Sequence, residues 1–560
     1  MKRVAAIILL ASFSIGAAGD CDGNMPNGPD PQNGACCLPG GSCLDTTEED
    51  CSTMSGAFNA DQACTDVNCP PPPPATGACC LPDGSCLDTT TDDCSTMTGA
   101  FNTDQACTDV SCPPPPPANG ACCLIDGTCR DSDEIDCAAR SGTFNEGQGC
   151  NDVTCAAPSL QDIRNLAQDL ESILREDLKD YIHTVGIVGR EYWNLNGDDP
   201  RYTGELLGRL GASPAPDSPL TTRTFLARYK AVRHAETLMT AVQNTSASLT
   251  QEQQNAIRGY AKTIQAYALL LVFNHQFTNG ILPVGSLDDP DPANFLDFTG
   301  SLQNIADLLD EAATLLTNGG SSFVFNLSAG FAGFTTPATF RQVNRALSAR
   351  VRIYQGDKAG AISGIAGSFF NINGSMSTGP KHSYSIETRN PMFHHPDEDL
   401  FTVHPTFISN AIAGDLRVSQ KTRAYIPTAE FFVPVALEGL VGDRQVNVVA
   451  LDTDPFPIIR NEELILIYAE AQIGSNVNEV LAAINRVRNA AGLGNYLGAT
   501  DDASLLNEVL KQRRYSLFGE GHRWIDLRRT GKLGQVPIDR VGDVVHTEFP
   551  RPAQATLDEI

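Results

Sequence analysis

Residues 460–471 read Arg-Asn-Glu-Glu-Leu-Ile-Leu-Ile-Tyr-Ala-Glu-Ala, and they open a series of three predicted helices near the C-terminus. The first helix runs from Glu462 to Ile473 and breaks at Gly474-Ser475-Asn476. The second stops at Gly492, and the third runs from about Ser504 to Phe518. The apolar residues of the second helix recur at helical spacing: Val480, Ile484, Val487 and Ala491. Short turns between amphipathic helices predict antiparallel pairs.

The same periodicity extends upstream to about Leu160. The first apolar face there consists of Ile163, Leu166, Leu170 and Ile173, at spacings of three and four residues. Thr250 with Gln253 resembles a capping box, and the helix that follows fades near Asn279-Gly280. A further helix covers about 340–354. Stacked helix pairs of this kind predict a tetratricopeptide-like scaffold.

Residues 375–450 interrupt the helical pattern. They are rich in Pro, Gly and His and contain short β-branched runs such as 446–449. We predict loops and small strands laid on the helical scaffold, where binding residues usually lie. The expected fold class is therefore mainly α: a tetratricopeptide-like helical-pair scaffold with a loop-rich insertion, preceded by small disulfide-rich repeats.

All 19 cysteines lie between residues 21 and 155, which marks a sharp domain boundary. Eighteen of them form three repeats, at 34–69, 77–112 and 120–155, each beginning Gly-Ala-Cys-Cys-Leu and containing a later Gly-x-Phe. The repeated cysteines are Cys36, Cys37, Cys43, Cys51, Cys64 and Cys69; Cys79, Cys80, Cys86, Cys94, Cys107 and Cys112; and Cys122, Cys123, Cys129, Cys137, Cys150 and Cys155.

Each repeat is too small to fold on an apolar core alone, so covalent links are needed. An even number of cysteines in an exported chain predicts three disulfides per repeat, and fifteen connectivities are open. The vicinal pair must bond outward, because adjacent cysteines bridge only with strain. Zinc is the alternative, but the repeats lack both a Cys-x2-Cys pair and histidine.

Proline runs at 70–74 and 113–117 separate the repeats. Such runs favour extended polyproline II, which predicts a semi-rigid stalk. The alternative is an array that binds a surface polymer, and the sequence does not decide between the two.

The N-terminus is typical of a signal peptide over residues 1–18, followed by a linker over 19–33. Lys2 and Arg3 precede the apolar run 4–15, which is too short to cross a bilayer. Cys21 is a candidate lipid anchor, although Asp20 suits lipid attachment badly and ordinary cleavage after Ala18 competes. The sequence therefore predicts an exported protein whose only membrane attachment would be such an anchor.

The chain is acidic. Its 560 residues carry 67 Asp and Glu against 39 Lys and Arg, giving a formal charge of −28. Such a surface repels nucleic acid and anionic membranes, so neither is an expected partner.

Three blocks near the C-terminus carry a family resemblance. They are residues 460–471, residues 484–493 with Ile-Asn-Arg-Val-Arg and Ala-Gly-Leu, and residues 513–529, which include Gly-Glu-Gly-His-Arg-Trp-Ile-Asp-Leu-Arg-Arg. In order and spacing they resemble the SusD/RagB family of nutrient-uptake outer-membrane proteins, with weaker likeness over about 160–560. Family members usually have acids where this chain has Gln512 and Ser516, and the cysteine repeats are not part of their usual plan.

The resemblance implies capture of an oligomeric nutrient, often a glycan, on the outer face of the outer membrane. It also implies delivery to a TonB-dependent barrel of the SusC type. We expect no catalysis and no cofactor, because no Gly-x-Ser-x-Gly, His-Glu-x-x-His or phosphate loop occurs. The alternative is a secreted or surface protein-interaction or adhesion scaffold without a transport role.

The C-terminal motif residues alternate in charge within packed helices, so we expect structural ion pairs. They are Glu470, Arg488, Glu520, Arg523 and Asp526. Trp524, inside the same block, is expected in the core.

A ligand site for sugars needs aromatic rings for stacking and polar groups for hydroxyls. The best cluster in loops gives the candidate ligand-binding residues Tyr192, Trp193, Asn194, Asn196 and Tyr202, with core packing of Trp193 as the alternative. His394, His395 and Asp397 with His404 form a second cluster, which we interpret as surface residues; no metal site is expected.

Overall fold

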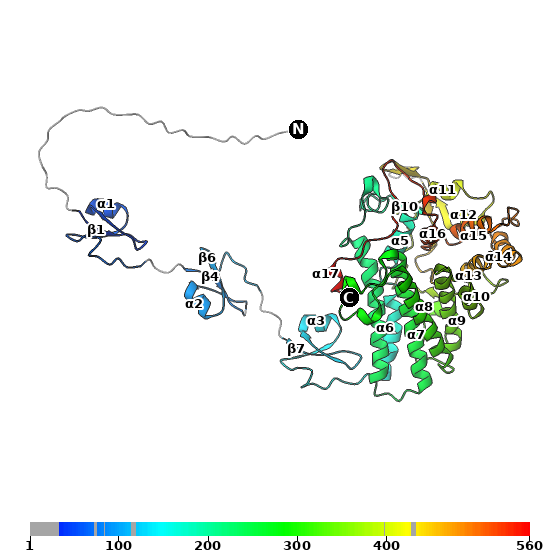
Figure 1. The fold of residues 1–560 in the computed structure, drawn as a ribbon, viewed down its shortest axis with the longest axis horizontal. Helices are drawn as coiled ribbons and strands as arrows, with labels where there is room; N and C mark the ends of the chain where they lie inside the picture. Colours follow the sequence, from blue (N-terminus) through cyan, green and yellow to red (C-terminus); the bar gives the residue numbers. More distant parts are fainter. Residues whose placement is uncertain (1–32, 72–75, 83, 114–118, 397, 427–432) are drawn as a thin grey trace, which may run out of the picture. The chain divides into compact units, whose positions relative to one another are not determined.

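The computed structural model describes residues 33–71, 76–82, 84–113, 119–396, 398–426 and 433–560. They fall into two compact units, residues 1–117 with the first two repeats and residues 118–560 with the third repeat and the helices (Figure 1). The predicted signal peptide, Cys21 and most of the predicted linker and proline runs lie outside the described residues.

Each repeat is a three-stranded antiparallel sheet with one short helix, and the strand with the vicinal cysteines is central. The first repeat contains β1 (Gly34–Cys37), β2 (Cys43–Thr46), α1 (Glu48–Thr53) and β3 (Ala57–Asn59). The second contains β4 (Thr76–Cys80), β5 (Cys86–Thr90), α2 (Thr91–Thr96) and β6 (Ala100–Thr103). The third contains β7 (Asn119–Cys123), β8 (Cys129–Asp133), α3 (Glu134–Ala139) and β9 (Thr143–Glu146).

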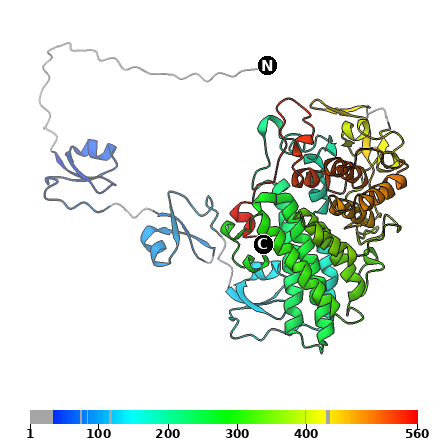
Figure 2. The ribbon, with the colours of Figure 1, turned by 45° about the vertical axis from the view of Figure 1, so that its right-hand side comes forward.

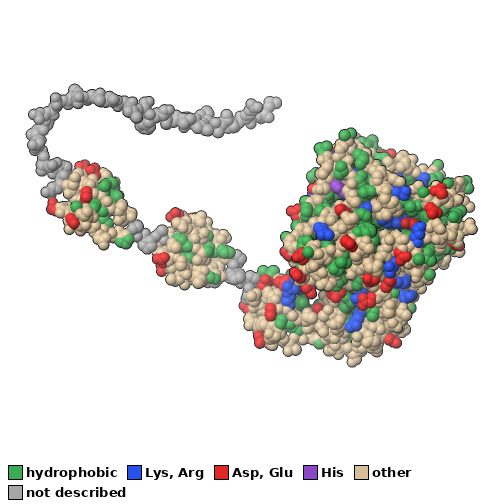
Figure 3. Space-filling view, in the orientation of Figure 1, with side chains coloured by type: hydrophobic (Ala, Val, Ile, Leu, Met, Phe, Trp, Pro, Cys, Tyr) green, Lys and Arg blue, Asp and Glu red, His purple; other side chains and the backbone are tan. Residues whose placement is uncertain are grey.

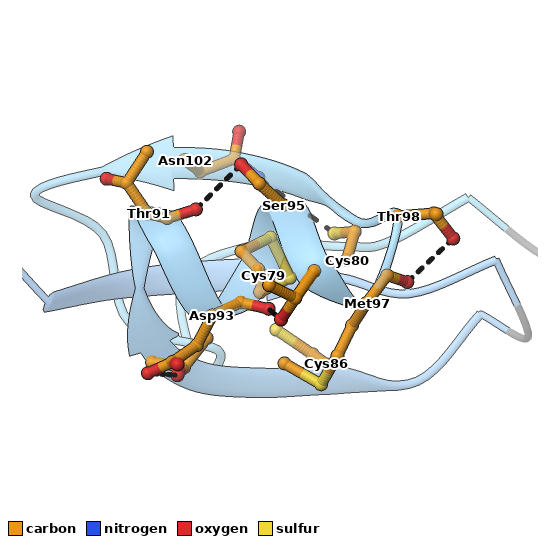
Figure 4. Close-up of a disulfide and its surroundings, with 12 residues drawn as sticks. Cys79, Cys80, Cys86, Thr91, Asp93, Ser95, Met97, Thr98 and Asn102 are labelled. Carbon is orange, nitrogen blue, oxygen red and sulfur yellow. Dashed lines mark hydrogen bonds between the residues drawn. A yellow bond between two sulfur atoms is a disulfide. The ribbon is translucent and has the colours of Figure 1, made fainter.

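The eighteen repeat cysteines form nine disulfides, three in each repeat, as predicted. Each repeat has the same order, and in the first the bonds are Cys36–Cys51, Cys37–Cys69 and Cys43–Cys64. The vicinal cysteines bond to different partners because successive side chains on a strand point to opposite faces. Figure 4 shows the second repeat around Cys79, Cys80 and Cys86, where helix α2 lies over the sheet.

The glycines shared by the repeats are explained by the lack of space for a side chain at their positions. A Cβ on Gly56 would lie 2.4 Å from Cys36 Sγ, and a Cβ on Gly34 would lie 2.7 Å from the ring of Phe58. Glycine is therefore required wherever the sheet, the helix and the disulfide meet.

The third repeat contacts the helices directly. Asn244 Nδ2, at the end of helix α6, donates to the carbonyl of Asp126 at 3.0 Å. Gly127 lies against Pro158, so a Cβ there would approach its ring to 2.8 Å. This repeat is thus packed on the helical region, and the predicted stalk does not describe it.

Successive helices of the scaffold pack against one another, as predicted for stacked helix pairs (Figure 2). They are α4 (Leu160–Ile173), α5 (Leu178–Val188), α6 (Pro219–Asn244), α7 (Gln251–Gln276), α8 (Phe298–Thr317), α9 (Pro337–Tyr354), α10 (Lys358–Ala366), α13 (Asn461–Gln472), α14 (Val477–Ala490), α15 (Asp502–Ser516) and α16 (Arg523–Arg529). Thr250 and Gln253 form the predicted capping box of α7. The mainly α fold class is confirmed, although α5, α6, α8 and α10 were not predicted individually.

Short strands and helices fill the insertion. They are β11 (Lys381–His382), β12 (Phe401–Val403), α11 (Pro405–Ser409), α12 (Leu416–Lys421), β13 (Thr422–Ala424), β14 (Val435–Leu437), β15 (Leu440–Gly442) and β16 (Arg444–Val446). Outside the insertion lie β10 (Tyr192–Asn194), β17 (Phe456–Pro457) and α17 (Gln554–Leu557). A four-stranded sheet of order β10-β12-β16-β13 joins the loop after α5 to the insertion. The β-branched run at 446–449 is not a strand of its own, because β16 ends at Val446.

One apolar core runs through the helices and the four-stranded sheet, and a second lies among α13, α14 and α15. Among the described residues no helix is both long and apolar enough to cross a bilayer.

Candidate functional site

The predicted aromatic cluster lies inside the protein. Tyr192 and Trp193 are only 1% and 4% exposed, because β10 is covered by β12 and by the helices. Asn194 is also buried, whereas Asn196 and Tyr202 are half-buried. Tyr192 donates its hydroxyl to the carbonyl of Ile182. The two rings that were expected to stack on a sugar therefore have no solvent-exposed face. For Trp193, this is the core packing that was given as the alternative.

Asp539 binds residues from two distant segments. Its Oδ2 accepts from Trp193 Nε1 at 3.0 Å and from Arg190 Nε at 3.1 Å, and its Oδ1 accepts from His404 Nε2 at 2.7 Å. The carboxylate side chain is 4% exposed, and its hydrogen bonds to His404 and the Arg190 charge hold its pKa below the usual range despite burial. No sequence motif points to Asp539, because it lies in a loop without one.

The second cluster, interpreted from the sequence as surface residues, is only partly at the surface, because His394 and His404 are buried. His394 stacks on Phe401 with ring centroids 4.1 Å apart, while His395 is exposed and Asp397 lies outside the described residues. His404 instead belongs to the Asp539 network. Within the described part of the chain, the groups of three potential metal ligands that converge are all disulfide-bonded cysteines, which offer no thiolate.

The Asp539 network ends at an open cleft. His404 Nδ1 lies 2.8 Å from Thr406 Oγ1, which accepts from Arg514 Nη2 at 2.8 Å. Arg514 lines a cleft of about 390 Å³, which we name the α15 cleft. Its lining residues are Asn410, Asn507, Leu510, Lys511, Arg514, Tyr515, Arg523 and Gln535.

Local structure explains this convergence. Asn507, Lys511 and Arg514 recur at spacings of four and three on α15, so they share one helix face. Arg523 is the first residue of α16, after a turn at Gly519 and Gly521 that has positive φ at both glycines. That turn folds α16 back beside α15 and brings Arg523 to the same cleft as Arg514.

The expected ion pairs of the C-terminal motif form, with one exception. Arg529 pairs with Glu470, Arg488 with Glu508, and Arg513 with Asp526, at 2.5 to 2.6 Å. Glu520 pairs with Arg460 and Lys421. Trp524 is fully buried, as expected, and donates to the carbonyl of His546.

Arg523 is that exception: its side chain forms no hydrogen bond or ion pair with the described residues, which corrects the expectation. Burial and the neighbouring Arg514 lower its pKa to about 10. Arg523 is thus a cation held at the cleft without a partner.

Gln512 and Ser516, the two departures from the family pattern, are both hydrogen-bonded. Ser516 Oγ accepts from Arg417 and donates to Glu462, and Gln512 donates to Glu508. Arg513 keeps two buried nitrogens, Nη1 and Nη2, without a hydrogen bond.

A second, wider cleft of about 790 Å³ lies between the third repeat, α6 and the C-terminal residues. Its cations are paired with carboxylates, among them Arg140 with Asp136, Lys230 with Glu176, and Arg233 with Asp288. On the face drawn in Figure 3, acidic and basic side chains are interspersed over the helical unit. The wider cleft therefore presents little unsatisfied positive charge.

Comparison with known proteins identifies a family that part of this chain resembles. Residues 419–554 match the model of the SusD family. Over these residues the chain is similar to the SusD family. The match includes α13 to α16, which carry most of the α15 cleft and most of the buried ion pairs.

Solved structures extend the SusD-like fold over most of the chain. A SusD superfamily protein from Bacteroides vulgatus has 17% identity and a TM-score of 0.55, covering 71% of this chain and 97% of that one. Surface glycan-binding protein A from Bacteroides thetaiotaomicron has 13% identity and a TM-score of 0.54 over the same shares. The latter protein is also solved in complex with laminarihexaose, with a TM-score of 0.52. These likenesses show the fold, and the comparison with curated proteins gave no match.

Proposed function

We propose that this protein binds an oligomeric nutrient, a glycan, at the outer face of the outer membrane and delivers it to a TonB-dependent transporter of the SusC type. The observation that carries the proposal is its SusD-family region, in a fold shared with a surface glycan-binding protein solved with laminarihexaose. We place the glycan in the α15 cleft, whose volume lies within the range of small-ligand sites. We propose a binding role without catalysis.

Glycan capture is tested with the full chain after export. The purified protein is screened against a panel of neutral and acidic oligosaccharides, and each hit is titrated by calorimetry. Binding of a glycan with no release of shorter products supports a non-enzymatic binder. A chain that binds no glycan in the panel contradicts glycan capture.

Delivery is tested in the native envelope. The protein is extracted in mild detergent and captured, and the proteins that accompany it are identified. A TonB-dependent barrel in near-stoichiometric amount supports delivery. Recovery of the protein alone from the soluble fraction contradicts it and favours the secreted adhesion or interaction scaffold.

The proposed anchor has its own control in that fractionation. Cys21→Ser removes the thiol that a lipid would modify. A lipid-anchored chain moves from the membrane to the soluble fraction on this change, whereas an unanchored chain shows the same distribution before and after it.

A further inference from the structure

The α15 cleft is positively charged within an acidic protein. Lys511, Arg514 and Arg523 line it, and no Asp or Glu is among its described lining residues. The chain as a whole has a formal charge of −28. Three cations that converge in a concave site raise the local potential and attract an anion.

The carboxyl groups beneath the cleft do not neutralise these cations. The carboxyls that act electrostatically on Arg523 are Asp526 and Glu191. Asp526 is already bonded to Arg513 and Arg529. Glu191 is buried, and burial raises its pKa to about 8, so it is largely uncharged at neutral pH. The field of the arginines is therefore directed into the cleft.

The arginines are also held in place. Arg514 is fixed by its hydrogen bond to Thr406 and lies over the ring of Tyr515 at 5.9 Å. The backbone of Arg523 is fixed as the first residue of α16. A half-buried guanidinium without a partner costs stability, and a bound anion would offset that cost through charge-assisted hydrogen bonds.

Neutral hydrogen-bonding groups surround the cations. Asn410, Asn507 and Gln535 are exposed amides at the cleft. Amides can donate to and accept from hydroxyls. The lining thus combines charge recognition with the groups suited to a sugar ring.

We propose that the α15 cleft binds the anionic group, a carboxylate or a sulfate ester, of an acidic sugar residue in the glycan. This inference rests on the proposed function, since it names the class of glycan that the same site takes. Arg514 and Arg523 hold the anion, Lys511 adds charge at the open side, and the amides contact the hydroxyls.

The test is calorimetric titration of the full chain with three oligosaccharides: trigalacturonate, a sulfated carrageenan tetrasaccharide and neutral laminarihexaose. Arg523→Gln should weaken binding of an acidic probe about 10- to 100-fold, as expected for loss of a charge-assisted hydrogen bond. Lys511→Gln should weaken it about threefold, because that side chain is more solvated. Lys262→Gln, which removes a cation on α7 outside the cleft, is the matched control and should leave affinity within twofold.

Two features of the test separate a loss of binding from a loss of folding. Lys511 makes no hydrogen bond with the described residues, so its variant tests the charge without removing an internal contact. Thermal unfolding of each variant is compared with the parent. The carboxylate and sulfate probes separate the two sources of the anion, and either one that responds to Arg523→Gln supports the proposal.

Other results overturn it. If only laminarihexaose binds, or if acidic probes bind Arg523→Gln and Lys511→Gln as tightly as the parent, glycan capture stands and the anionic site does not. If hexaglutamate binds in place of any oligosaccharide and loses affinity in Arg523→Gln, the cleft takes an acidic peptide. If no oligosaccharide binds at all, glycan capture itself fails.

Discussion

Trp193 and Asp539 lie 346 residues apart in the chain, and the indole Nε1 of Trp193 donates to Asp539 Oδ2 at 3.0 Å. The same carboxylate binds the buried Arg190 and His404. One acid thus ties the loop after α5 to the insertion and to the C-terminal segment, directly behind the α15 cleft.

Loss of this carboxylate should destabilise the protein. We expect Asp539→Asn to lower the free energy of unfolding by about 3–5 kcal/mol, because it leaves the Arg190 guanidinium buried without its ionic partner. Urea unfolding followed by Trp fluorescence measures the change. Asp198→Asn, at an exposed loop position, is the control and should shift stability by less than about 0.5 kcal/mol. Equal effects of the two changes would contradict the role assigned to Asp539.

The buried pair of Arg350 with Glu463 should show strong coupling. The two side chains are 4% and 2% exposed, and their closest N···O distance is 2.6 Å. Either Arg350→Met or Glu463→Met leaves one buried charge unpaired, which costs about 3–5 kcal/mol. The double variant should cost less than the sum of the single ones.

A double-mutant cycle in urea measures that coupling. The exposed pair of Lys230 with Glu176 is the matched control, and its coupling should stay below about 1 kcal/mol. Additive effects at Arg350 and Glu463 would show that the pair does not act as a unit.

The steric role of Gly56 can be tested against Gly40 in the same repeat. A Cβ on Gly56 would lie 2.4 Å from Cys36 Sγ, whereas a Cβ on Gly40 meets nothing within 4 Å. Gly56→Ala should therefore reduce the yield of fully oxidised protein severalfold, and Gly40→Ala should leave it unchanged. Mass spectrometry of free thiols after refolding measures the fraction with all disulfides formed, and equal yields would contradict the steric argument.

Glu191 should make stability depend on pH. Burial raises its pKa to about 8 from an ordinary value of 4.5, against the weaker opposing effects of the Gly519 amide, Lys421, Arg523 and Arg514. Between these two pH values the folded state holds a proton that the unfolded state has lost, so this group's contribution to stability falls as pH rises. The slope is at most about 1.4 kcal/mol per pH unit.

Glu191→Gln removes that titration and keeps the acceptor for the Gly519 amide. The variant should therefore gain stability relative to the parent as pH increases from about 5 to 8. Unfolding curves at several pH values measure the difference, and parallel stability profiles would rule out a raised pKa at Glu191.

The sequence by itself determined the periodic and repetitive features of this protein. The helices of 160–173 and 461–516, the capping box at Thr250 and the spacing of the repeat cysteines all follow from local patterns. Such features depend on contacts between near neighbours, which the sequence displays directly.

Only the tertiary structure decided which cysteines pair, that Trp193 is buried and that Arg523 lies unpaired beside Arg514. Each depends on residues brought together across many turns of chain: Cys37 with Cys69, Trp193 with Asp539, and α15 with the start of α16. The reason is that packing chooses among contacts that the local pattern leaves equally open, as it did among the fifteen possible disulfide arrangements of each repeat.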